Sequence, residues 1–97
     1  MVEQRFVLRG AVDVMTAPEL RRQLLTFVNT TTGDVVIDCD GLDFIDSMGI
    51  AALLSAQRVL RVQGREMHVS NLRGIARHAT DALGLTEILT FSDLEPA

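Results

Sequence analysis

The stretch from Val35 to Ile50, VVIDCDGLDFIDSMGI, contains the pattern that decides the fold. A short apolar strand, Val35–Cys39, leads through an Asp-rich turn to the segment Asp46–Gly49. Apolar residues then recur at helical spacing, which predicts a helix from about Ser47 to Gln63. The N-terminus of a helix has free N–H groups and the positive end of the helix dipole. A hydroxyl at Ser47 is therefore expected to be exposed and well placed to accept and hold a phosphate.

Strands and helices alternate along the rest of the chain. Three further segments have strand character, namely Arg5–Gly10, Glu66–Ser70 and Glu87–Phe91, and two have helical spacing, namely 16–29 and Leu72–Leu83. Such alternation implies crossover connections and a parallel sheet. We therefore predict one α/β domain spanning residues 1–97, with a mostly parallel four-stranded sheet and three main helices.

The first of these helices has a recognisable start. Thr16 is suited to the N-cap position, and Glu19, three residues later, would complete a capping box. Pro18 falls in the first turn, where its missing N–H is tolerated. These residues predict that Thr16 caps the helix.

Composition narrows the class of protein. The chain has 97 residues, a net charge of −4 and a single cysteine, Cys39. The negative charge argues against direct binding of nucleic acid, and one cysteine fits a reducing compartment. No apolar run approaches the roughly 20 residues that span a bilayer, and the N-terminus does not resemble a signal peptide. We expect a cytoplasmic protein without a membrane span.

A metal site is the first alternative for the Asp-rich segment. Asp38 and Asp40 have the spacing of calcium ligands, but Leu42 occupies the next ligand position and no Glu closes the loop. The other candidates, His68, His78 and Cys39, are far apart in the sequence. We predict no metal site and no cofactor.

A phosphatase is the second alternative. The segment Val35–Gly41 resembles the first motif of haloacid-dehalogenase-type phosphatases, with Asp38 as nucleophile and Asp40 as acid/base, and His68–Asn71 resembles the second motif. A carboxylate that attacks a phosphate needs a balancing cation. The lysine that this family supplies and its closing acidic pair are both missing, so the phosphatase remains a remote alternative. We predict that the chain is not an enzyme and has no catalytic residue.

The third alternative covers nearly the whole chain and is a resemblance to STAS domains, the fold of bacterial anti-sigma factor antagonists. Gly10–Asp13 and Thr16–Leu20 are similar to the family's first strand end and first helix. Val35–Leu54 resembles its central motif, and Gly64–Met67 the turn into the next strand. Asn71–Phe91 resembles its last helix and strand, whereas an initial strand and a C-terminal helix of the family are expected to be missing.

The resemblance implies a phosphorylation-switched protein-binding role. An ATP-binding anti-sigma factor serine kinase would bind the domain, release its sigma factor and phosphorylate Ser47, and a phosphatase would reset the switch. Met48 stands where many members have a second hydroxyl, so Ser47 is the only one in the motif. The partner-binding residues that the resemblance implies are Asp13, Asp46, Ser47, Met48 and Gly49.

Two further expectations concern the same motif. Asp46 is placed to cap the second helix or to orient Ser47, and a phosphate on Ser47 would lie beside Asp43 and Asp46. Gly49 would let the partner approach closely or would relieve crowding at the helix start. The alternative within the same fold is a STAS subunit that partners a transporter ATPase or belongs to a stressosome.

Overall fold

A parallel sheet lies against two helices in the computed structural model, which describes residues 4–72, 74 and 90–91. The elements follow in the order β1 (Gln4–Val12), α1 (Ala17–Asn29), β2 (Val35–Ile45), α2 (Ser47–Val62), β3 (Met67–Ser70) and β4 (Thr90–Phe91). The strand order is β1-β2-β3-β4, and each neighbouring pair is parallel. The predicted α/β fold with a parallel sheet is confirmed, while the third helix expected at 72–83 falls almost entirely outside the described residues.

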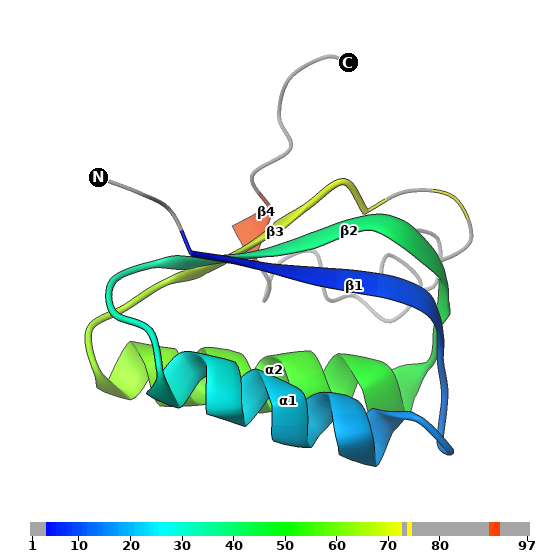
Figure 1. Cartoon of the computed structure of the whole chain (residues 1–97), viewed down its shortest axis with the longest axis horizontal. Coiled ribbons are helices and arrows are strands. Elements are labelled where there is room, and N and C mark those ends of the chain that lie inside the picture. Colours follow the sequence, from blue (N-terminus) through cyan, green and yellow to red (C-terminus); the bar gives the residue numbers. More distant parts are fainter. Residues whose placement is uncertain (1–3, 73, 75–89, 92–97) are drawn as a thin grey trace.

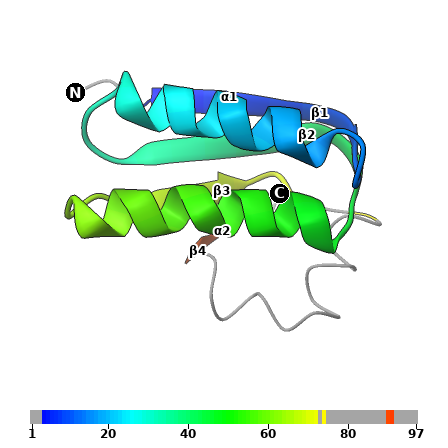
Figure 2. The ribbon, with the colours of Figure 1, turned by 90° about the horizontal axis from the view of Figure 1, so that it is seen from below.

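The two helices cover the same face of the sheet. Figures 1 and 2 show α1 and α2 side by side, both running back against the direction of the strands. Each helix therefore starts at the edge of the sheet where the preceding strand ends. The starts of α1 and α2 consequently lie at the same end of the molecule.

Strand β2 is longer than the sequence suggested. We expected it to end at Cys39, but it continues to Ile45 and enters α2 directly. Its pairing with β1 shifts at 7–9 and again at 10–11, and at each shift β2 contains one more residue than β1. Such bulges bend a strand, and Figure 1 shows both strands curving toward the helices at this end. The residues after Cys39, which we expected to form a turn, are therefore part of a strand that contains β-bulges.

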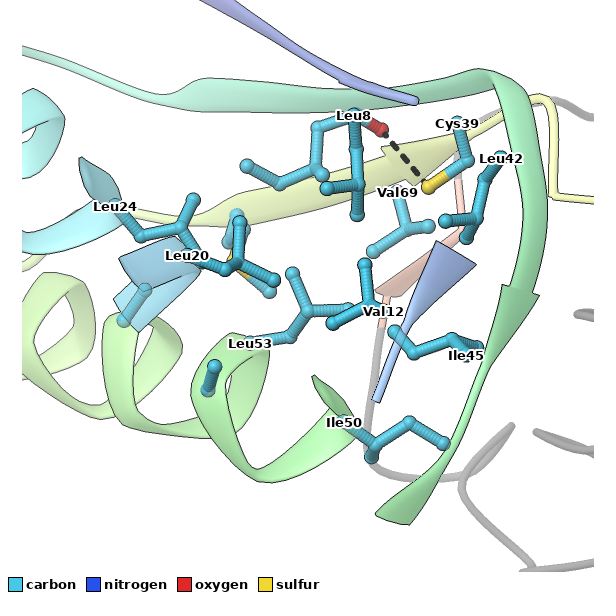
Figure 3. Packing of buried hydrophobic residues seen from close by; sticks show 14 of the residues in the cluster. Leu8, Val12, Leu20, Leu24, Cys39, Leu42, Ile45, Ile50, Leu53 and Val69 are labelled. Atoms are coloured by element: carbon cyan, nitrogen blue, oxygen red, sulfur yellow. Dashed lines mark hydrogen bonds between the residues drawn. The ribbon is translucent and has the colours of Figure 1, made fainter. Parts of the chain in front are cut away.

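The core lies between the sheet and the helices and is aliphatic. Side chains from β1, β2, β3 and both helices converge there in Figure 3, among them Leu8, Leu20, Leu42, Leu53 and Val69. Cys39 belongs to this cluster, and its thiol donates a weak hydrogen bond to the carbonyl oxygen of Ile37 at 3.9 Å. The cysteine therefore packs as a small buried hydrophobe, as its place in the strand predicted.

Arg65 ties the other end of the domain together, where β2 and β3 begin. Its guanidinium donates hydrogen bonds to the carbonyl oxygens of Gly33 at 2.7 Å and Val28 at 3.0 Å. It also donates to Thr31 Oγ1 at 2.9 Å and Gln63 Oε1 at 2.8 Å. One side chain thus joins the end of α1, the loop before β2 and the end of α2. We call these contacts the Arg65 clamp.

Candidate functional site

The ends of β1 and β2 bring two aspartates to one edge of the sheet. Val12 pairs with Ile45, and the Val12 carbonyl oxygen accepts a hydrogen bond from the Asp46 N–H at 3.0 Å. Asp13 and Asp46 directly follow the paired residues. In open parallel sheets, functional sites form at this carboxyl edge. The prediction that these two strands are parallel neighbours ending at a common edge is confirmed.

Asp46 caps α2. Its carboxylate accepts hydrogen bonds from the backbone N–H groups of Met48 at 2.9 Å and Gly49 at 3.1 Å. Its backbone carbonyl accepts from the Ile50 N–H at 3.0 Å. The expected capping role is confirmed. Two N–H groups that were expected to be free for a phosphate therefore already bind the Asp46 carboxylate.

Asp13 holds the turn that leads into α1, whereas Thr16 makes no side-chain cap bond. The Asp13 carboxylate accepts hydrogen bonds from the N–H groups of Met15 at 2.9 Å and Thr16 at 3.2 Å. In return, the Asp13 N–H donates to Thr16 Oγ1 at 3.0 Å. Thr16 occupies the N-cap position without a side-chain cap bond, and Glu19 instead binds Arg22 and Gln23. The predicted capping box is therefore wrong; the spacing of Asp13 and Thr16 was the signal for the reciprocal pair.

The three residues after Asp46 differ in accessibility. Ser47 and Met48 are exposed at the first turn of α2, whereas Gly49 is buried. An ideal Cβ built on Gly49 would lie only 2.6 Å from Cγ1 of both Ile45 and Val12. Of the two roles considered for this glycine, relief of crowding is therefore the one that the packing requires. A contact between Gly49 and a partner stays a prediction.

A second polar cluster lies on the sheet around Asp38. Its Oδ1 accepts hydrogen bonds from Asn71 Nδ2 at 2.9 Å and the Asp40 N–H at 3.0 Å, and its Oδ2 pairs with Arg5 at 3.0 Å. The structure thus brings together the residues of the phosphatase alternative. Both Asp38 oxygens are already bound, however, so this carboxylate is held by structural contacts.

These contacts lower the pKa of Asp38. The hydrogen bond from Asn71 has the largest effect, burial opposes it, and the Asp40 N–H and Arg5 add to the lowering. The charged carboxylate therefore stabilises the fold above its ordinary pKa of about 3.9. That stabilisation is lost as the pH falls through the lowered pKa of the folded state.

We expect Asp38→Asn to reduce the free energy of unfolding at pH 7 by about 1–2 kcal/mol, because it removes charge-assisted hydrogen bonds. Urea unfolding should show this difference shrinking as the pH is lowered from about 5 toward 3. Asp43→Asn, which changes an exposed carboxylate, is the control. A difference between Asp38→Asn and wild type that stays constant over this range would contradict the assignment.

The described part of the chain has neither a metal-binding cluster nor a membrane-spanning helix. Within 4–72, 74 and 90–91, no group of three or more His, Cys, Asp or Glu side chains is arranged to hold a metal ion. Neither α1 nor α2 is long and apolar enough to cross a membrane. His78, one of the candidates from the sequence, lies outside these residues.

Comparison with known proteins places this geometry in a family. An anti-sigma-B factor antagonist of Staphylococcus aureus is 21% identical over 80 residues, which are 82% of this chain and 74% of that protein. A sulfate transporter family protein from Wolinella succinogenes has a similar structure, with a TM-score of 0.75 and 18% identity over 98% of this chain and 84% of the other. The anti-sigma factor antagonist SpoIIAA in its unphosphorylated form gives a TM-score of 0.74 and 19% identity over 98% and 85%. The STAS domain profile matches residues 5–97, and the chain therefore belongs to the STAS domain family.

Proposed function

We propose that this chain is an anti-sigma factor antagonist whose switch is phosphorylation of Ser47. In its unphosphorylated form it binds an ATP-dependent anti-sigma factor kinase, which then releases its sigma factor. The kinase phosphorylates Ser47 and the complex dissociates, and a phosphatase restores the starting state. The chain itself catalyses no reaction and needs no cofactor. The names of the relatives and the exposed Ser47 at the start of α2 support this role.

The observation that carries the proposal is the environment of Ser47. Its side chain is exposed at the first position of α2, directly after the capping Asp46. A kinase can therefore reach the hydroxyl without unfolding the domain. Asp13 emerges from the neighbouring strand at the same edge of the sheet, and the exposed Met48 extends this surface. We propose that Asp13, Asp46, Ser47 and Met48 form the partner-binding surface.

The cap on α2 also explains how a phosphate would act. Phosphorylation adds a charge of about −1.5 to −2, and the phosphate on Ser47 would lie next to the Asp46 carboxylate. Because Asp46 already binds the N–H groups of Met48 and Gly49, the two anions would compete for the same donors. The added charge changes the surface that the kinase contacts. A loss of about 3 kcal/mol of binding free energy would weaken the complex more than a hundredfold.

We expect the purified kinase and ATP to phosphorylate wild-type protein on Ser47 only. Ser47→Ala should stay folded and keep the kinase bound in the presence of ATP, because the hydroxyl that ends the interaction is missing. Peptide mapping by mass spectrometry and size-exclusion chromatography with and without ATP measure the two effects.

Thr26→Ala is the control. It removes an exposed hydroxyl from α1 and should change neither phosphorylation nor release. Phosphate found on Ser55 or Ser70 would exclude Ser47 as the switch. ATP-driven release of the Ser47→Ala variant would also rule out the mechanism.

The second candidate function is a STAS subunit that partners a transporter ATPase or belongs to a stressosome. The structural similarity to a sulfate transporter family protein is the observation that favours it. Affinity purification from the native host separates the two functions. Recovery of a small ATP-binding kinase supports the antagonist, whereas recovery of a transporter ATPase supports the alternative.

A further inference from the structure

A groove lies between the first turns of α1 and α2. It has a volume of about 370 Å³ and is formed on one side by Ala17, Pro18 and Arg21 and on the other by residues that include Met48, Ala51 and Ser55. Most of these side chains are small or apolar. Met48 retains 48% of its accessible surface. The groove therefore offers an apolar floor that can receive a side chain from outside the domain.

Ser47 lies close to the groove in α2, although it is not one of the lining residues. Residues four apart on a helix lie on one stripe of its surface, and Ser47, Ala51 and Ser55 have this spacing on α2. Ala51 and Ser55 line the groove, so Ser47 stands at the end of the groove where both helices begin. A partner that reaches the Ser47 hydroxyl is thus in position to fill the groove.

Arg21 is the single charged residue among the described residues that line this groove. Among the described residues, Arg21 has no ion pair or hydrogen bond, whereas the adjacent Arg22 is paired with Glu19. An unpaired guanidinium beside an apolar floor is complementary to an apolar side chain flanked by a carboxylate. Within the part of the chain that the structure describes, no acidic side chain lines the groove to compete for that role.

We infer that the groove is the docking site for a segment of the anti-sigma factor that places an apolar side chain between α1 and α2 and a carboxylate against Arg21. The inference rests on the proposed function, since it identifies the surface by which that partner is held. It also accounts for release, because a phosphate on Ser47 brings negative charge to the end of the groove that receives an acidic segment.

The test uses the purified kinase that phosphorylates this chain, with affinity measured by isothermal titration calorimetry. Ala51→Phe, a change at an exposed position, should fill the groove and weaken binding at least tenfold. Arg21→Gln should weaken binding about tenfold and reduce its dependence on salt, because one charge pair is lost. Arg22→Gln is the matched control and should bind like wild type. Circular dichroism and thermal unfolding establish that each variant is folded.

The steady-state kinetics of Ser47 phosphorylation distinguish an effect on kinase docking from an effect on phosphate transfer. Ala51→Phe and Arg21→Gln should raise the KM for this chain and leave kcat close to the wild-type value, because Ser47 itself is unchanged. If wild type binds the kinase and both variants bind equally tightly, the groove is not the docking site, whereas the antagonist function stands. No binding of wild type would overturn the function and the inference together. Self-association of wild type that Ala51→Phe abolishes, with kinase binding unchanged, would assign the groove to a second copy instead.

Discussion

Gly49→Ala is expected to destabilise the domain by about 1–3 kcal/mol, although alanine is the better helix former. The added methyl group would lie 2.6 Å from Cγ1 of both Val12 and Ile45. Both neighbours are buried and β-branched, so their side chains have little freedom to move away. Overpacking of this kind typically costs about 1–3 kcal/mol. It outweighs the gain of about 1 kcal/mol in helix propensity when glycine becomes alanine.

Urea unfolding monitored by circular dichroism measures the effect, and Gly49→Val should lose more than Gly49→Ala. Ser47→Ala is the control, because it adds alanine to the same first turn at an exposed position. A stability of Gly49→Ala equal to or above that of wild type would show that Val12 and Ile45 move aside. The glycine would then need another explanation, such as close approach by the partner.

The second large effect is expected for Leu24→Ala, which should destabilise the domain by about 2–5 kcal/mol. Leu24 lies in the part of α1 that faces the sheet and has no accessible surface. Removal of its side chain leaves a cavity in the core shown in Figure 3 and reduces the packing that holds α1 in place. For a domain of this size, each kcal/mol lowers the Tm by about 4–8 °C.

Leu25→Ala gives a matched comparison, because the same change is made one residue later at a half-buried position. We expect it to cost clearly less than Leu24→Ala in thermal and urea unfolding. Equal losses in the two variants would mean that the face of α1 that packs on the sheet has been misassigned.

The order of the elements was predictable because apolar spacing distinguishes strands from helices over long segments. The end of β2 was not, because Asp40 and Gly41 are typical turn residues. In the folded protein their backbone remains in the sheet as a bulged strand that pairs with β1. Pairing of this kind depends on a neighbouring strand that lies far away in the sequence. The preferences of Asp40 and Gly41 for turns therefore could not predict that β2 continues through them.

The candidate site was predictable where it depends on residues that are adjacent in the chain. Asp46 and Ser47 are such a pair, and the cap on α2 follows from their order. The contacts of Asp13 in the turn before α1 were missed because Thr16 and Glu19 matched a more familiar pattern. The groove with Arg21 could not be predicted, since it exists only where α1 and α2 lie side by side.

The Arg65 clamp and the proposed partner-binding surface lie at opposite ends of the strands, and this separation affects how the protein can evolve. The clamp fixes the loops at the amino ends of β2 and β3 through Gly33, Val28 and Thr31. Substitutions of exposed residues around Ser47 leave those contacts untouched. Under the proposed function, each copy that arises from a gene duplication could therefore change its surface to match a different kinase while keeping the same fold. Changes at one end of the domain would then be enough to stop one paralogue from binding the partner of another.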